Sequence, residues 1–198
     1  DEVLKAFPAE SVRLYYLQSQ YRSSLPWGPD ALPDALAMLS RLYEAKEVAL
    51  SMKGQESASD VAASLGDDAT TVLNLGATFE ERFIAALDDD FNSAQALGLL
   101  FEFARALNRF SGHKKARKRG ASLAALYLNA CALVHDALGL MGDDVDRFME
   151  VVKEKRLDAM GIAREDVESL LRDRASARAN KDWAAADEIR AKLDTLGI

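Results

Sequence analysis

Apolar residues recur every three or four positions through most of the chain, which is the spacing of one face of an α-helix. Pro8 opens the first such segment, which ends at "YRSSLPWGPD" (21–30), where prolines and a glycine predict a loop. Asp30 is placed to cap the next helix, whose apolar positions repeat at the same spacing: Leu32, Leu36, Leu39 and Tyr43.

The remaining pattern predicts more helices separated by polar breaks. Residues 52–78 are small, polar and weakly periodic, so we expect a variable linker there, with room for one short helix. Helices are predicted over 79–87, 93–110, 121–141 and 144–157, with "SGHKKARKRGAS" (111–122) as a break. The last two, 164–180 and 183–196, form an αα-hairpin with Asp182 as cap and Gly197 as stop. The predicted fold class is all-α: a bundle of four to five helices plus a C-terminal helical hairpin, divided into 1–142 and 143–198.

Composition and net charge argue against several classes of protein. The 198 residues carry a net charge of −7, which argues against wholesale wrapping of nucleic acid but leaves room for a local basic patch. The single cysteine, Cys131, excludes an intramolecular disulfide and fits a reducing cytoplasm. No apolar run approaches the roughly 20 residues of a membrane helix, so we expect no membrane partner. There is no signal peptide and no initiator methionine, so we expect a piece of a longer protein.

The acidic triplet Asp88-Asp89-Asp90 could bind a metal or start a helix. Asn92 is a preferred N-cap, Gln95 lies three residues later at capping-box spacing, and Phe91 can staple onto the first turn. Carboxylates near a helix N-terminus also favour its dipole. A hard-cation site would need further oxygen ligands at regular offsets and a glycine for the turn. The triplet is therefore interpreted as the start of a helix.

No other residue set predicts chemistry. Cys131 and His135 share a helical face, but a structural zinc needs four ligands, and the remaining histidine is His113 in the basic break. The chain has no glycine-rich phosphate loop, no nucleophile elbow and no paired-histidine metal motif. We therefore expect neither a catalytic residue nor a metal ligand in this sequence, and no bound cofactor.

The basic residues are the feature of this sequence that predicts a binding surface. The segment "HKKARKRG" holds Lys114, Lys115, Arg117, Lys118 and Arg119, which either grip a polyanion through its phosphates or form a solvated loop. A second set in the tail has acidic residues interleaved, which favours surface ion pairing over RNA contact: Arg172, Arg174, Arg178, Lys181 and Arg190.

Aromatic residues at two places in the chain could serve either packing or RNA contact. Trp183 follows the Asp182 cap and is expected to pack the hairpin rather than stack on a base. Tyr21, Arg22 and Trp27 lie in a loop at a helix end, where they could grip RNA or close the bundle against a neighbouring domain.

Three stretches together resemble the cysteinyl-tRNA synthetases. "SVRLYYLQSQYRSSLPW" (11–27) resembles the segment after that family's signature lysine loop, and "FEERFIAALDDDFNSAQALGLLFEFARALNR" (79–109) resembles its stem-contact bundle. "ESLLRDRASARANKDWAAADEIRAKLDTLGI" (168–198) resembles its C-terminal hairpin at the start of the anticodon-reading domain. The stretches follow the family's order over about half the chain; the basic break lies outside them.

The resemblance implies a class I synthetase that activates cysteine with ATP and transfers it to its tRNA. The family's His-Ile-Gly-His type motif, Lys-Met-Ser-Lys-Ser loop and thiol-reading zinc lie in a catalytic domain absent from this sequence. The chain would begin just after the lysine loop, so it would position tRNA without catalysing ligation. Its expected partners are a cysteine-specific tRNA and the catalytic domain, with no DNA partner. Two alternatives remain: a free-standing helical scaffold that binds no RNA, and the related ligase that joins cysteine to an amino sugar.

Overall fold

The computed structural model describes residues 2–195, which form eleven helices and no strand within that range. The predicted all-α class is confirmed. The chain divides into two compact units and passes from one to the other within α9 (Val145–Met160), between Met149 and Glu150. The boundary predicted between residues 142 and 143 stays a prediction.

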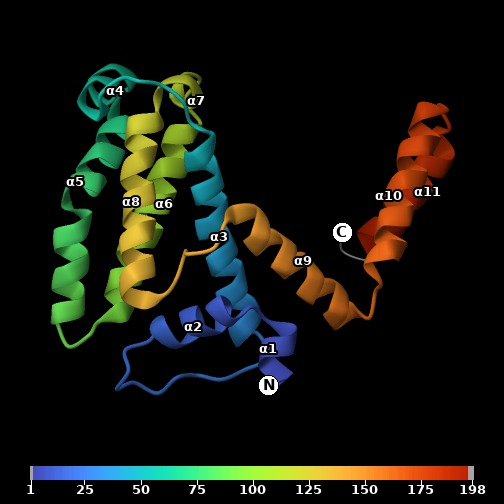
Figure 1. The fold of residues 1–198 in the computed structure, drawn as a ribbon, viewed down its shortest axis with the longest axis horizontal. Helices are drawn as coiled ribbons and strands as arrows, with labels where there is room; N and C mark the ends of the chain where they lie inside the picture. The colour runs from blue at the N-terminus through green and yellow to red at the C-terminus, as the bar shows by residue number, and fades with distance from the viewer. Residues whose placement is uncertain (1, 196–198) are drawn as a thin grey trace. The chain divides into compact units, whose positions relative to one another are not determined.

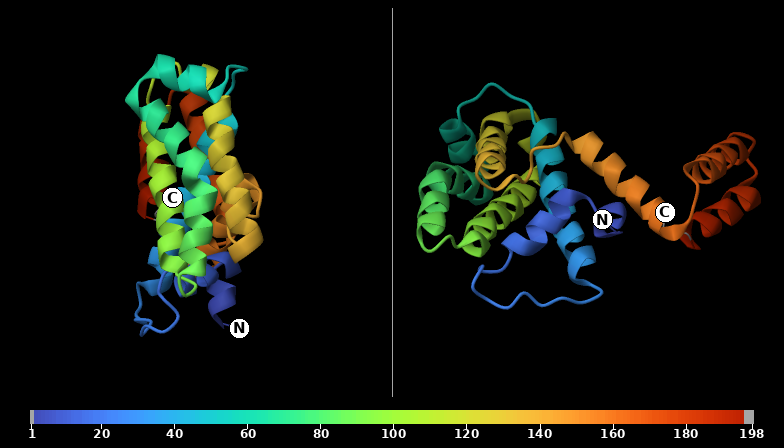
Figure 2. Two further views of the ribbon diagram at one scale, coloured as in Figure 1. Left: turned by 90° about the vertical axis from the view of Figure 1, so that its left-hand side faces the viewer. Right: turned by 60° about the horizontal axis from the view of Figure 1, so that its bottom comes forward.

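The larger unit, Phe7–Met149, is built on four long helices. They are α3 (Ala31–Ser51), α5 (Asp67–Asp88), α6 (Ser93–Ser111) and α8 (Ala121–Leu138). These helices run side by side, as two directions of view show (Figures 1 and 2). The short helices α4 (Ala58–Leu65) and α7 (Ala116–Arg119) lie at one end of this bundle, and α2 (Ala9–Leu17) lies near the other. Phe103 and Tyr127 pack edge to face in the core, with ring centroids 5.4 Å apart.

The linker expected at 52–78 is wrong in part. The one short helix allowed for is α4, whereas residues 67–78 form the first half of α5 and not a linker. Ala69 and Val72 are fully buried, and Gly76 faces α8 so closely that an added Cβ would lie 2.6 Å from Leu126 Cδ1. Small residues let two helices approach, but they contribute little hydrophobicity to a sequence pattern.

Helix α8 is long and apolar enough to pass a length-and-composition test for a membrane span. The same composition suits a core helix, and α8 packs against α3, α5 and α6.

A buried polar network closes the α2 end of the bundle. The Tyr43 hydroxyl donates to the Glu10 carboxylate at 2.9 Å and accepts the Asp143 backbone N–H at 3.1 Å. The Met141 backbone N–H also donates to Glu10. The Tyr43 ring stacks on Phe148 with centroids 3.9 Å apart. Burial raises the pKa of Glu10 more than these hydrogen bonds lower it.

The smaller unit joins α1 (Glu2–Ala6) to the chain from Glu150 onward. Lys155 Nζ donates to the carbonyl oxygens of Leu4 and Lys5, at 2.7 and 3.0 Å. Arg164, the first residue of α10 (Arg164–Ala179), pairs across to Glu150 of α9 at 3.0 Å and with Glu168 of its own helix at 2.9 Å. These contacts connect the α10–α11 hairpin to α9, where α11 is Trp183–Thr195.

Candidate nucleic-acid interface

The C-terminal hairpin is formed by two helices with a small core. Val167, Ala186 and Leu193 are buried, whereas most other positions of α10 and α11 are exposed. The predicted Asp182 cap is confirmed, because its carboxylate accepts the Ala185 backbone N–H at 3.1 Å. Lys181 has a φ of +61°, so the turn holds it in the left-handed region that non-glycine residues rarely adopt. The predicted stop at Gly197 lies outside the described residues.

Trp183 is largely exposed and not a buried packing anchor, contrary to expectation. As the first residue of α11 it is 60% exposed, and the residues three and four positions on are a small alanine, Ala186, and a carboxylate, Asp187. An exposed indole offers a flat face on which an unpaired base can stack.

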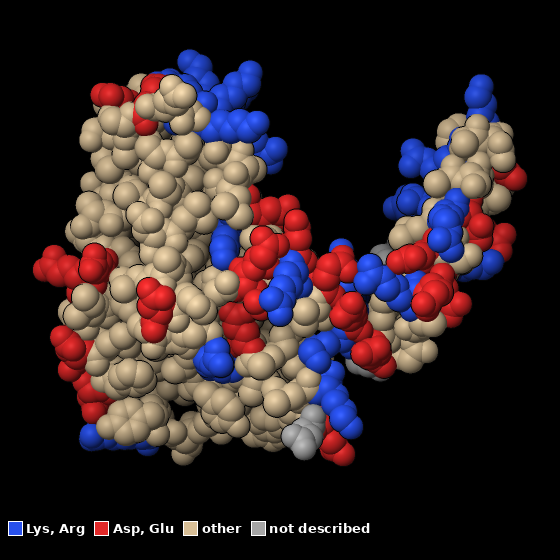
Figure 3. Space-filling view, viewed as in Figure 1, with Lys and Arg blue, Asp and Glu red and all other residues tan. Residues whose placement is uncertain are grey.

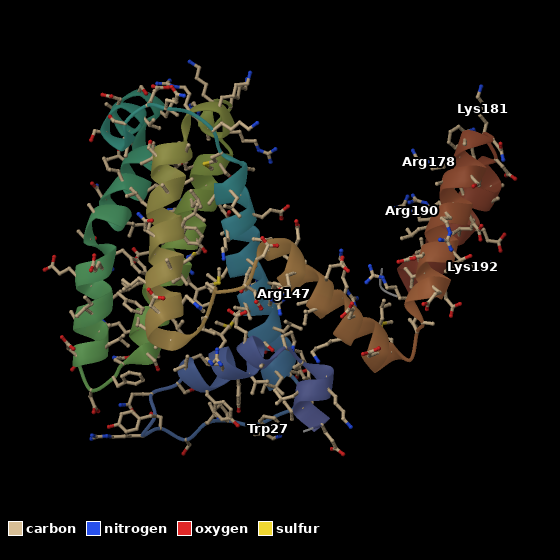
Figure 4. The ribbon with its side chains drawn as sticks, in the orientation of Figure 1. Trp27, Arg147, Arg178, Lys181, Arg190 and Lys192 are labelled. Carbon is tan, nitrogen blue, oxygen red and sulfur yellow. The ribbon has the colours of Figure 1, made fainter. Side chains whose placement is uncertain are left out.

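The cations of the tail lie on both sides of Trp183 along the chain. Figure 4 shows Arg178 and Arg190 on one side of the hairpin and Lys181 at its tip. Among the described residues, Arg178 and Lys181 form no ion pair, so the expected pairing with interleaved acids is wrong for them. Arg174 is only partly exposed, and its Nε is buried without a hydrogen-bond partner in that part of the chain. The hairpin therefore combines one exposed aromatic ring with two cations, Arg178 and Lys181, that form no ion pair among the described residues, although acidic residues are interleaved along both helices and Lys192 pairs with Glu188.

Arg22 lies in a different environment from the tail cations. Its guanidinium forms an ion pair with Asp90 at 3.1 Å and lies over the Tyr21 ring. Gln20 and the Tyr21 hydroxyl donate to the same carboxylate, at 3.1 and 3.0 Å. Asp90 thus joins the 20–22 turn to the turn before α6, and Arg22 is the counter-ion in that link.

The predicted Asn92 cap is confirmed, but the acidic triplet ends a helix before the next one begins: Asp88 is the last residue of α5 and Asp89 is its C-cap. The Asn92 side chain accepts the Gln95 backbone N–H at 3.0 Å and donates to the Gln95 side chain at 3.2 Å. Phe91 does not act as the expected staple, because it is 50% exposed and has a φ of +53°. Among the described residues no cluster of three or more histidine, cysteine, aspartate or glutamate side chains could hold a metal ion.

The basic break is an ordered end of the bundle. Its centre forms the single turn α7, and Ala116 of that turn is fully buried. Arg119 donates to Glu56 and to Ser64 of α4, so this predicted tRNA contact is held in an ion pair. The other four cations of the segment are exposed and form no ion pair within the described chain: Lys114, Lys115, Arg117 and Lys118. Figure 3 shows positive side chains gathered at this end of the bundle.

Cys131 is not placed for chemistry. Burial raises the pKa of its thiol to about 12, so the nucleophilic thiolate is scarce at neutral pH. The Tyr127 ring neighbours this thiol within the bundle core.

Comparison with known proteins agrees with this geometry. The DALR domain family matches residues 82–141, which include α6, α7 and α8. The cysteinyl-tRNA ligase anticodon binding domain family matches residues 163–198, which include the hairpin.

Curated relatives match the full length of the chain. It is 36% identical over 200 residues to a cysteine–tRNA ligase of Syntrophotalea carbinolica, covering 39% of that protein. It is 36% identical over 203 residues to one of Chromohalobacter salexigens, covering 36% of it. It is 34% identical over 200 residues to one of Geobacter metallireducens, covering 40% of it. The chain therefore spans well under half the length of these relatives.

Proposed function

We propose that the α10–α11 hairpin binds the anticodon loop of a cysteine-specific tRNA. The premise is that the chain, which carries both matched domains, belongs to the cysteine–tRNA ligase family. The exposed Trp183 indole is the observation that carries this proposal. Anticodon bases are unpaired and can stack on an aromatic face, and RNA is recognised by sequence mainly at such single-stranded loops.

The cations of the hairpin support the same assignment. Arg178 and Lys181 lie within five residues of Trp183 on the exposed turn and on the end of α10. Phosphates flanking a stacked base can contact both side chains, because such contacts fix the position of the loop while the base edges carry specificity. Arg190 extends the positive surface onto α11, as Figure 4 shows.

The whole enzyme would join cysteine to this tRNA with ATP, in the cytoplasm. In this proposal cysteine, ATP and a zinc ion bind to the catalytic part of the enzyme, and the chain described here is inactive alone. Its contribution would be to hold the tRNA in register with that distant site, since correct positioning can supply a large part of a rate enhancement.

The two alternatives fit the observations less well. A scaffold without an RNA partner gives no reason for an exposed tryptophan beside unpaired cations. A ligase that joins cysteine to an amino sugar has no anticodon to read, whereas the family match at 163–198 is to an anticodon binding domain.

The chain's two tryptophans offer a direct test. In Trp27→Phe the remaining reporter is Trp183, and its fluorescence should be quenched when a cysteine tRNA transcript is added. In Trp183→Phe the remaining reporter is Trp27, which is 66% exposed and packs edge to face on Tyr15 at 5.6 Å. That reporter should not respond. Quenching of Trp27 alone would move the RNA contact to the 21–30 loop and overturn the proposal.

A further inference from the structure

We propose that the end of the bundle around α7 is a second RNA contact, which binds the phosphodiester backbone without reading bases. We call this surface the basic platform and define it by Lys53, Lys114, Lys115, Arg117 and Lys118. The inference rests on the proposed function, since it takes tRNA as the partner, but it concerns a different surface and a different kind of contact.

Two segments far apart in sequence form the platform. The Lys53 backbone N–H donates to the Arg117 carbonyl at 2.8 Å, and the Ala121 backbone N–H donates to the Lys53 carbonyl at 3.2 Å. These bonds place Lys53, two residues beyond the end of α3, beside the turn that follows α6. Sequence analysis missed Lys53, because only the fold brings it to the basic segment.

The platform is fixed in place by close packing beneath it. A Cβ on Gly54 would lie 2.8 Å from the Arg119 Cα, and Gly54 has a φ of +128°. A Cβ on Gly120 would lie 2.7 Å from the Ala116 carbonyl oxygen and 2.8 Å from Phe110 Cε1. Both glycines permit contacts that a side chain would prevent. A surface ordered before binding loses less conformational entropy when it binds.

The charge of the platform is uncompensated. The nearby carboxylate of Glu56 is occupied by Arg119, whose hydrogen bonds hold the pKa of Glu56 below its usual value. Elsewhere in the bundle several exposed arginines are paired, such as Arg82 with Glu102 at 3.1 Å and Arg22 with Asp90 at 3.1 Å. No platform cation has such a partner among the described residues. In a chain of net charge −7, this concentration of positive charge suits a polyanion.

The composition of the platform favours phosphates over bases. It has four flexible lysines and one arginine and no aromatic residue, so it lacks the stacking face that the hairpin has. Lysine acts on phosphate as a point charge and carries no base specificity. Contact with RNA should therefore depend on salt and be insensitive to the anticodon.

The test compares two variants of equal net charge. The platform variant changes all five platform cations to glutamine. The control variant changes five exposed cations outside both proposed contacts to glutamine: Lys5, Arg82, Arg109, Lys153 and Arg156. Circular dichroism confirms that both variants fold. Binding to a cysteine tRNA transcript, and to one with its anticodon replaced, is measured between about 50 and 200 mM salt.

The platform variant should bind both transcripts roughly tenfold or more weakly at the lowest salt, with a slope of log affinity against log salt shallower by about 2 to 4. The control variant should keep most of the wild-type slope. Equal slopes for the two variants would overturn the inference. That result would leave the proposed function standing, provided that Trp183→Ala still weakens binding to the unaltered transcript. An unaffected Trp183→Ala beside a weakened platform variant would instead remove the hairpin's proposed role.

Discussion

Removing the Tyr43 hydroxyl should destabilise the bundle more than removing any neutral hydroxyl of equal burial. Tyr43→Phe keeps the ring stacked on Phe148 but removes the donor to Glu10 and the acceptor for the Asp143 N–H. A hydrogen bond to a charged group contributes about 1.5–3 kcal/mol, and the part-buried Asp143 N–H left without an acceptor adds to the loss. We expect a total of about 2–4 kcal/mol, or a melting temperature lower by roughly 4–16 °C for a chain of this size.

Tyr127 supplies the matched control. Its ring is also fully buried, but its hydroxyl donates to a neutral acceptor, the Leu42 carbonyl, at 3.2 Å. Tyr127→Phe should therefore cost only about 0.5–1.5 kcal/mol in denaturant melts followed by circular dichroism. In a Glu10→Gln background the cost of Tyr43→Phe should fall by about 1 kcal/mol, because the hydroxyl then bonds a neutral amide and not a carboxylate. Equal losses for the two tyrosine variants, or no coupling to Glu10, would refute this reasoning.

Three other predictions concern pH, thiol reactivity and helix packing. Burial raises the folded-state pKa of Glu10 above its unfolded value of 4.5. The contribution of Glu10 to stability is therefore present below pH 4.5 and is lost as pH rises through the folded-state pKa. Urea melts at several pH values should show this loss in the wild type and not in Glu10→Gln. Cys131, with its pKa raised to about 12, should react with a thiol reagent only after denaturation, and labelling of the native chain at pH 8 would disagree. Gly76→Ala should destabilise by about 1–2 kcal/mol, because its Cβ would lie 2.7 Å from Leu126 Cβ. Gly98→Ala has no atom within 4 Å and should stabilise α6 by about 0.5–1 kcal/mol, so the two alanine variants should change the melting temperature in opposite directions.

Local signals in the sequence predicted the starts of α6 and α11, whereas Asp30 precedes α3 without the expected side-chain cap. The Asn92 and Asp182 caps use side chains within three residues of the N–H groups that they accept, so their spacing is visible without a fold. The all-α class followed from the same helical periodicity. The first half of α5 was harder to predict because only Ala69 and Val72 are buried there, and small residues such as Ala69 and Gly76 hardly differ from a linker in hydropathy.

The candidate site was harder to predict because contacts between distant parts of the sequence decide which of its cations are paired with a carboxylate. Arg22 and Arg119 resemble their neighbours in sequence, yet the fold pairs each with a carboxylate more than 60 residues away. Lys53 joins the basic segment only through backbone bonds to Arg117 and Ala121. The exposure of Trp183 was not predicted for a different reason: alanines directly follow it on α11, and their small side chains leave most of a large indole uncovered.

The central claim is that the hairpin reads the anticodon loop through Trp183, and one affinity measurement tests it most directly. Wild type and Trp183→Ala are each titrated with a cysteine tRNA transcript and with the same transcript carrying a replaced anticodon. Loss of one stacked base costs about 1–3 kcal/mol, so the variant should bind the unaltered transcript roughly 5 to 150 times more weakly. It should bind the altered transcript more weakly by a similar factor, because an aromatic face can stack on any base. Equal binding of the two proteins to the unaltered transcript would contradict the account.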